Sequence, residues 1–171
     1  MKLTTRQLTL CALLTAMALA LSYLENLFPL SLAIPIPGVK LGLANIVTLF
    51  ALYALGGGEA LLILLARCFL GSLFAGNMNA LLFSLFGGLC AFGTMTALSR
   101  LRGLSIYGVS VGGAAAHNCG QIAAALLTLG SGAPLYYLPV LLAVSLLTGG
   151  LTGLVSACLF QGLRNTDFRK G

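Results

Sequence analysis

Long apolar stretches separated by short polar breaks constrain this chain more than any other feature of its sequence. These stretches cover approximately residues 7–28, 41–55, 59–75, 79–98, 106–129 and 135–163. A membrane-spanning helix needs about 20 apolar residues, so about six spans would use about 120 positions and leave about 50 for the loops and tails. We therefore expect residues 1–171 to form a single integral membrane domain. Its predicted fold is an all-α bundle of six transmembrane helices without a separate soluble domain.

The scarcity of charge supports this class and excludes several kinds of chemistry. Only 7% of the residues are charged, whereas soluble domains carry about 25%. The acidic residues are Glu25, Glu59 and Asp167 alone, so the chain cannot assemble the paired aspartate clusters, such as DDxxD, that hold metal-bound diphosphates. It also lacks a GxxxxGK[ST] phosphate-binding loop. Transport powered by ATP would therefore depend on the ATPase of a partner.

The basic residues predict the topology. If the N-terminus is cytoplasmic and the loops alternate between the two sides, then Lys40 falls outside and Arg67 lies within a span. The remaining basic residues all fall inside: Lys2, Arg6, Arg100, Arg102, Arg164, Arg169 and Lys170. Cytoplasmic loops of membrane proteins are enriched in Lys and Arg, so we expect a multi-pass protein of the cell (cytoplasmic) membrane with both termini cytoplasmic. These residues form no basic stripe with stacking aromatics, which argues against nucleic acid as a partner.

The first apolar stretch has two interpretations. Its basic start resembles a signal peptide, but no polar cleavage region follows, which favours a first membrane helix. Small residues repeat on it at helical spacing, at Ala12, Ala16 and Ala20. Helices in lipid associate where side chains are short. We expect a partner subunit to dock on this stripe, whereas the pairs Gly108–Gly112 and Gly149–Gly153 are interpreted as internal packing.

Prolines interrupt the connector between the first two stretches. Pro29, Pro35 and Pro37 prevent a continuous helix. Irregular apolar backbone at membrane level is tolerated only where protein covers it or where it lines a cavity. Residues 29–38 are therefore a candidate lid.

Arg67 is the charge that most needs an explanation. It lies near the middle of its span, where a charged side chain costs at least about 2.5 kcal/mol. Glu59, about 12 Å away along the same helix, is too distant to pair with it directly. The compensating group is then on another helix, with Glu25 as one candidate, or it is an anionic ligand. Snorkelling of Arg67 toward an interface is a further alternative.

Three polar residues lie close together in the fifth stretch. His117, Asn118 and Gln121 share one sector of a helix because they are spaced three and four residues apart. His117 falls about 16 Å along this helix, level with Arg67. The cluster indicates either a polar pocket or a satisfied core histidine. A metal site is not expected, because the chain has no second histidine and few carboxylates.

Lys40 and Asn45 extend this polar set, although Lys40 also suits an interfacial anchor. The predicted ligand-binding residues are Lys40, Asn45, Arg67, His117, Asn118 and Gln121. Their positive bias suits a ligand with phosphate or carboxylate groups. No catalytic constellation is evident, since His117 and Cys119 point away from each other on a helix. No motif predicts a cofactor, and the cysteines are interpreted as packing residues.

Four segments together resemble the Gx transporter family, which is also catalogued as heptaprenyl diphosphate synthase component I. They are PGVKLGLANIV at residues 37–47, the segment 67–71, SLFGGL at residues 84–89 and GAAAHNCGQ at residues 113–121. The resemblance implies a six-helix membrane protein similar to the substrate-binding S components of energy-coupling factor vitamin transporters. In those proteins an alanine-rich first helix docks on a transmembrane coupling subunit, and the first external loop closes over the ligand.

The two family names imply different functions. A prenyl synthase uses Mg²⁺ held by aspartate clusters, which this chain lacks. In contrast, the alanine stripe, the proline-rich connector and the polar residues of the fifth stretch match an S component. We therefore expect the substrate-binding subunit of an uptake transporter for a small anionic, vitamin-like molecule, working with a coupling subunit and ATPases. The alternatives are a non-catalytic membrane component of heptaprenyl diphosphate or quinone synthesis, and a membrane module of an electron-transfer assembly.

Overall fold

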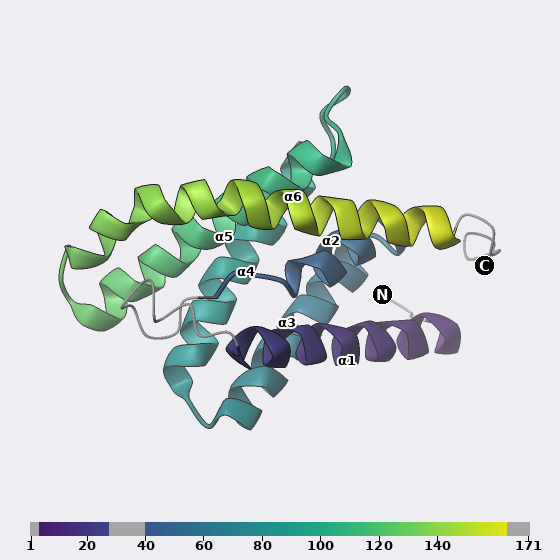
Figure 1. The fold of residues 1–171 in the computed structure, drawn as a ribbon. Coiled ribbons are helices and arrows are strands. Elements are labelled where there is room, and N and C mark those ends of the chain that lie inside the picture. The colour runs from purple at the N-terminus through teal and green to yellow at the C-terminus, as the bar shows by residue number, and fades with distance from the viewer. Residues whose placement is uncertain (1–3, 28–39, 164–171) are drawn as a thin grey trace.

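The computed structural model describes residues 4–27 and 40–163, and within them all regular secondary structure is helical (Figure 1). The elements are α1 (Thr5–Leu27), α2 (Asn45–Ala54), α3 (Gly57–Ala75), α4 (Met78–Leu98), α5 (Ile106–Leu129), the short 3-10 helix η2 (Ala133–Tyr137) and α6 (Leu138–Leu163). The all-α prediction is confirmed for this part of the chain. The start of α1 and the end of α6 lie at the same end of the bundle (Figure 1).

Four helical segments are long and apolar enough to cross a membrane: Thr5–Glu25, Gly57–Ala75, Met78–Leu98 and Ala133–Gly162. The helix α5 has 24 residues but is not among these segments, because its central polar side chains, His117, Asn118 and Gln121, lower its hydropathy. The helix α2 has only 10 residues, or about 15 Å, against about 30 Å for a hydrocarbon core. The helices thus indicate a membrane protein, while the six-span topology and the cytoplasmic termini remain predictions.

The second helix is shorter than the predicted span of residues 41–55. Residues 40–44 are not helical, and Gly42 adopts a φ of +83°. This left-handed conformation suits glycine and cannot continue a right-handed helix. The last predicted span also begins differently, because residues 133–137 form the 3-10 helix and α6 starts at Leu138.

Glycines bring α5 close to both of its neighbours, α4 and α6. A Cβ added at Gly149 would lie 2.6 Å from the Cα of Val111, and one at Gly153 would lie 3.1 Å from the Tyr107 ring. The Gly149–Gly153 pair therefore packs α6 directly on α5, which confirms the internal-packing interpretation. On the other side of α5, a Cβ at Gly120 would overlap the carbonyl of Phe86 on α4.

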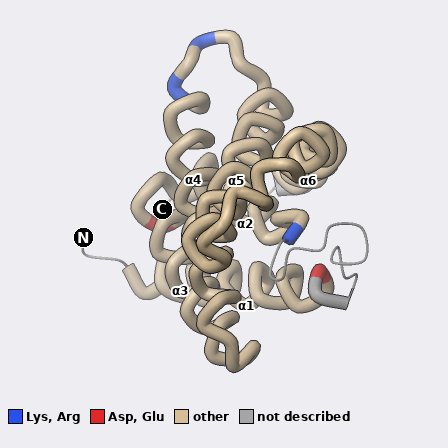
Figure 2. Tube along the Cα trace, turned by 90° about the vertical axis from the view of Figure 1, so that its left-hand side faces the viewer, with Lys and Arg blue, Asp and Glu red and all other residues tan. Residues whose placement is uncertain are grey.

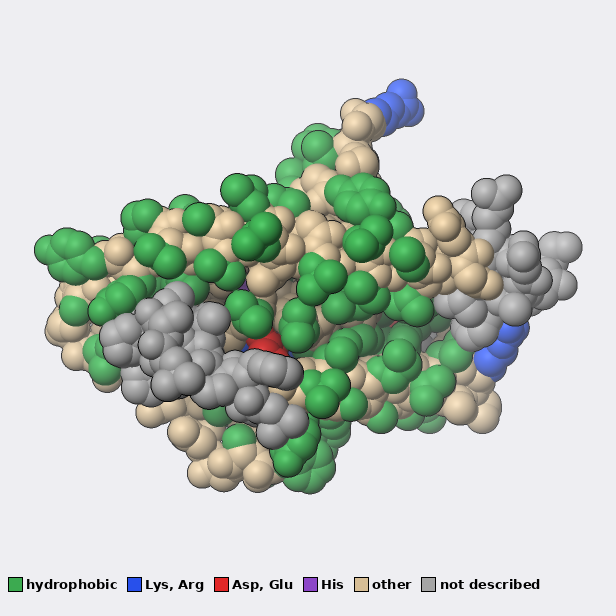
Figure 3. Space-filling view, in the orientation of Figure 1, with side chains coloured by type: hydrophobic (Ala, Val, Ile, Leu, Met, Phe, Trp, Pro, Cys, Tyr) green, Lys and Arg blue, Asp and Glu red, His purple; other side chains and the backbone are tan. Residues whose placement is uncertain are grey.

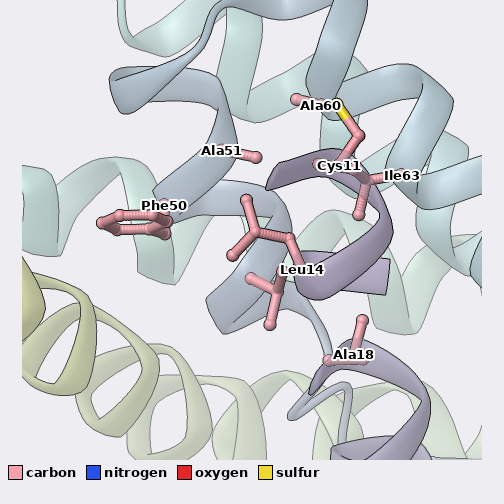
Figure 4. Close-up of a cluster of buried hydrophobic side chains, with 9 residues drawn as sticks. Cys11, Leu14, Ala18, Phe50, Ala51, Ala60 and Ile63 are labelled. Carbon is pink, nitrogen blue, oxygen red and sulfur yellow. The ribbon is translucent and has the colours of Figure 1, made fainter. Parts of the chain in front are cut away.

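A cluster of buried apolar side chains joins α1, α2 and α3, and we call it the apolar cluster (Figure 4). Its members are Cys11, Leu14, Ala18, Ala44, Val47, Phe50, Ala51, Ala60 and Ile63. The Phe50 ring also packs on Phe160 of α6, with ring centroids 5.0 Å apart. The predicted docking alanines Ala12, Ala16 and Ala20 are exposed on the other face of α1. This face therefore stays accessible beside the described remainder of the chain.

Candidate functional site

Arg67 lies on α3 one helical turn beyond the apolar cluster and is buried, with 7% of its surface exposed. Its Nη2 donates to the Oδ1 of Asn45 at the start of α2, over 3.4 Å. Its Nε has no hydrogen-bond partner among the described residues. On α4, a Cβ added at Gly88 would lie 3.4 Å from Nη2, so the absence of a side chain there leaves space for the guanidinium.

His117 and Gln121 lie one turn apart on α5 and are both buried. The His117 Nε2 and the Gln121 Nε2 form a hydrogen bond of 2.9 Å. The backbone N–H of Lys40 donates to the Gln121 Oε1 over 3.2 Å. The other ring nitrogen of His117, Nδ1, has no hydrogen-bond partner in the described part of the chain. Gln121 thus connects α5 to the residues that precede α2.

Two glycines allow the His117 ring to pack directly against backbone. A Cβ added at Gly87 of α4 would lie 2.8 Å from Nδ1, and one at Gly42 would lie 3.0 Å from Cδ2. Gly87 is next to Gly88, which borders Arg67. The α4 diglycine therefore borders two buried side chains, Arg67 and His117, that each have a nitrogen atom without a hydrogen-bond partner among the described residues.

Glu25, near the end of α1, completes the arrangement. Its Oε1 accepts a hydrogen bond from the backbone N–H of Gly42, and its carboxylate interacts electrostatically with both Lys40 and Arg67. The side chain is 5% exposed. Figure 3 shows acidic side-chain atoms at the bottom of a hollow between hydrophobic side chains, and Figure 2 shows an acidic and a basic position close together near the end of α1.

Lys40 contributes charge as well as its backbone N–H. Burial lowers the pKa of its ammonium group below the ordinary value, and the neighbouring Glu25 carboxylate opposes part of this effect. The other described basic positions include Arg100 and Arg102, which are exposed in the loop between α4 and α5 (Figure 2). Lys40 therefore interacts with the buried Glu25 carboxylate, whereas these two loop arginines are exposed.

Asn118 has a different neighbourhood from the other predicted ligand-binding residues. Its Nδ2 donates to the carbonyl of Leu141 in the first turn of α6, over 2.7 Å. The amide thus joins α5 to α6 and does not contact Arg67 or Asn45 through a hydrogen bond. Its role in binding a ligand remains a prediction.

The structure brings Lys40, Asn45, Arg67, His117 and Gln121 together, with Glu25 beside them. We call these six residues the polar cluster. Sequence reasoning named Glu25 only as a candidate partner of Arg67, and it overlooked the roles of Gly42, Gly87 and Gly88. Two short sequence signals contain these glycines, PGVKLG at residues 37–42 and FGG at residues 86–88. The candidate lid, residues 29–38, lies outside the described residues.

The chemistry of the polar cluster is that of hydrogen bonding and charge. The described residues include no group of three or more His, Cys, Asp or Glu side chains that could hold a metal ion. Cys119 is exposed, whereas His117 is buried, so these two side chains do not form a nucleophile and base pair. The cluster can bind an acceptor group through its unpartnered nitrogen atoms.

Comparison with known proteins identifies the family. The model of the family described as heptaprenyl diphosphate synthase component I matches residues 14–159, which include the whole polar cluster. No curated protein and no solved structure matches the chain. The match covers most of the sequence, and it agrees with the resemblance carried by the PGVKLGLANIV and HNCGQ segments. The chain therefore belongs to the heptaprenyl diphosphate synthase component I family.

Proposed function

We propose that this protein is the membrane-embedded substrate-binding subunit of an uptake transporter for a small anionic molecule. The observation that carries the proposal is the state of Arg67. Its guanidinium is buried in an apolar chain, with one long hydrogen bond to Asn45 and an unpartnered Nε among the described residues. Charged groups inside membrane proteins are costly and mark substrate pathways or binding sites. An acidic ligand would supply the missing partner.

The charges of the polar cluster support an anion in particular. Lys40 and Arg67 are basic, and Glu25 is the acidic side chain that interacts with both. Two cations against one carboxylate leave the cluster with an excess of positive charge. A ligand with one carboxylate or phosphate group would balance it, and such groups form short, strong hydrogen bonds with guanidinium donors.

The exposed face of α1 supports the transporter role. Ala12, Ala16 and Ala20 are exposed at intervals of one turn, and short side chains let two helices approach closely in lipid. In this proposal the stripe docks on a transmembrane coupling subunit, and ATPases bound to that subunit supply the energy for release of the ligand inside the cell.

The family description favours a second candidate function. Proteins of this family are described as component I of heptaprenyl diphosphate synthase, so the chain could serve as a non-catalytic membrane component of that synthesis. Its three acidic residues do not suffice for a metal-binding aspartate cluster. The polar cluster would then hold the diphosphate group of a prenyl lipid, a ligand that is also anionic.

Native mass spectrometry of the gently purified protein distinguishes these functions. We expect wild-type protein to retain a small hydrophilic acid, Arg67→Met to lose it, and the exposed-loop control Arg102→Gln to keep it. A retained prenyl diphosphate that depends on Arg67 would instead support the second function. Retention of no acidic molecule by wild-type protein, or equal retention by Arg67→Met, would contradict both.

A further inference from the structure

The orientation of the Gln121 amide follows from its partner at Lys40. A backbone N–H can only donate, so the atom of Gln121 that faces the Lys40 N–H must be the carbonyl oxygen, Oε1. The amide nitrogen Nε2 then faces His117, at 2.9 Å from the ring Nε2. The backbone of Lys40 therefore determines which end of the amide meets the histidine.

This orientation determines the position of the proton on His117. The amide nitrogen of Gln121 is a donor, so the Nε2 of His117 must be the acceptor and carries no proton. A neutral imidazole has one N–H and one acceptor nitrogen. The proton therefore resides on Nδ1, and the ring is a neutral Nδ1–H tautomer.

The Nδ1–H group then has the same property as the Nε–H group of Arg67. Both belong to side chains that are more than nine-tenths buried, at 3% and 7% exposure, and neither has a hydrogen-bond partner among the residues described. The backbone of Gly87 lies close enough to the ring to act on it as a hydrogen-bond acceptor, but the contact does not have the geometry of a hydrogen bond from Nδ1. Both side chains border the diglycine Gly87–Gly88. The open hydrogen-bonding capacity of these two residues consists of donors only.

We propose that the His117 Nδ1–H and the Arg67 Nε–H together bind an oxyanion of the ligand, a carboxylate or a phosphate, and that Gln121 is the positioning residue that holds His117 in the donor tautomer. This inference rests on the proposed function, since it specifies how the same cluster recognises an anion. A ligand group that could only donate hydrogen bonds would find no acceptor on these two side chains.

The tautomer is directly measurable because His117 is the only histidine of the chain. Ring-¹⁵N histidine labelling of the wild-type protein in detergent micelles gives one unambiguous pair of nitrogen resonances. We expect a protonated Nδ1 and an unprotonated Nε2 in ligand-free protein. A protonated Nε2, alone or together with Nδ1, would overturn the inference while leaving binding by Arg67 intact, so this failure is distinguishable from failure of the proposed function.

Titration of the same sample tests the donor role. Inorganic phosphate and acetate are the two probes, and a shift of the Nδ1 resonance with one of them identifies the preferred oxyanion. We expect this shift to disappear in Arg67→Met and to persist in Arg102→Gln. No shift with either probe, or an equal shift in Arg67→Met, would overturn the joint donor site even if the tautomer is as inferred.

Substitutions at His117 separate the two ring nitrogens. The amide nitrogen of an asparagine reaches the position of Nδ1, whereas that of a glutamine reaches the position of Nε2. We expect His117→Asn to retain affinity for the shifting probe within about threefold and His117→Gln to lose about tenfold, the effect of one lost hydrogen bond to a charged group. The reverse order would contradict the inference, and the wild-type resonances decide the tautomer if either variant fails to fold.

Replacement of Gln121 tests its positioning role. In Gln121→Met the ring Nε2 loses its donor, so we expect a mixture of the two tautomers in the ¹⁵N spectrum and a weaker response to the probe. A merely structural role would lower stability without changing the tautomer. An unchanged Nδ1–H tautomer in a folded Gln121→Met protein would therefore overturn the assignment of Gln121.

Discussion

The apolar cluster and the polar cluster are adjacent on α3 and similarly buried, but they differ in chemistry. Ile63 and Arg67 are four residues apart and so lie on the same helix face. Ile63 is fully buried in the apolar cluster (Figure 4). Arg67 is 7% exposed, and its Nε has no hydrogen-bond partner among the described residues. One turn of helix therefore separates a region of apolar packing from a buried donor that has no hydrogen-bond partner among the described residues.

We therefore expect the apolar cluster to contribute mainly to the stability of the fold and the polar cluster to contribute mainly to the proposed function. In lipid no hydrophobic driving force acts between helices, and close van der Waals packing holds them together. The packing of the apolar cluster therefore stabilises the contact of α1 with α2 and α3. Burial of an incompletely paired charge is unfavourable. Replacement of Arg67 by an apolar residue removes this cost, and Lys40 remains to balance the Glu25 carboxylate. Side chains that pack unfavourably are expected at sites where a protein binds a ligand or catalyses a reaction.

The largest effect on stability is expected from a cavity in the apolar cluster. Phe50→Ala removes a buried ring that packs on Phe160, and we expect the free energy of unfolding to fall by about 3–5 kcal/mol. Chemical denaturation in detergent micelles measures this change. Phe74→Ala, at a ring with 80% exposure, is the matched control and should have a small effect. Loss of ligand from folded Phe50→Ala protein would show that the two clusters are not separate.

Two glycine substitutions on α4 distinguish a position that borders the polar cluster from one that does not. A Cβ at Gly87 would lie 2.8 Å from the His117 Nδ1, whereas nothing lies within 4 Å of one at Gly93. We expect Gly87→Ala to displace the imidazole, reduce ligand retention and lower stability by about 1–3 kcal/mol. Gly93→Ala should raise stability by about 0.5–1 kcal/mol, because alanine favours a helix. Thermal unfolding and native mass spectrometry of both variants provide the test, and equal behaviour would contradict the role of Gly87.

The smallest effect on stability is expected on the exposed face of α1. Ala16→Leu should change the free energy of unfolding by less than about 0.5 kcal/mol, as is usual for exposed substitutions. It should nevertheless prevent copurification of a coupling subunit, because the larger side chain separates the helices. Ala97→Leu, at an exposed alanine of α4, is the control. Copurification and uptake at wild-type levels in Ala16→Leu would refute docking at this stripe.

The sequence was sufficient to predict the helical class because long apolar runs leave few alternatives to membrane helices. The constant rise per residue of a helix also led to the prediction that Arg67 and His117 share a depth, and the structure places the two side chains against the neighbouring glycines Gly87 and Gly88. It could not show that residues 40–44 are irregular, because the apolar pattern continues through Gly42 and its left-handed conformation depends on neighbours such as Glu25 and His117. The hydrogen bond of Asn118 to Leu141 of α6 could not be predicted either. The sequence shows which side chains share a helix face, but it does not show which helix packs on that face.

Measurement of the stability and the ligand content of Arg67→Met in the same preparation is the decisive test of the proposed binding site. We predict that this variant loses the acidic molecule retained by the wild type, and that its ligand-free form unfolds at the same or a higher denaturant concentration than ligand-free wild type. The opposite result, a folded protein that keeps the ligand, or a ligand-free form that is less stable by several kcal/mol, would show that Arg67 serves the fold and would contradict the proposed binding site.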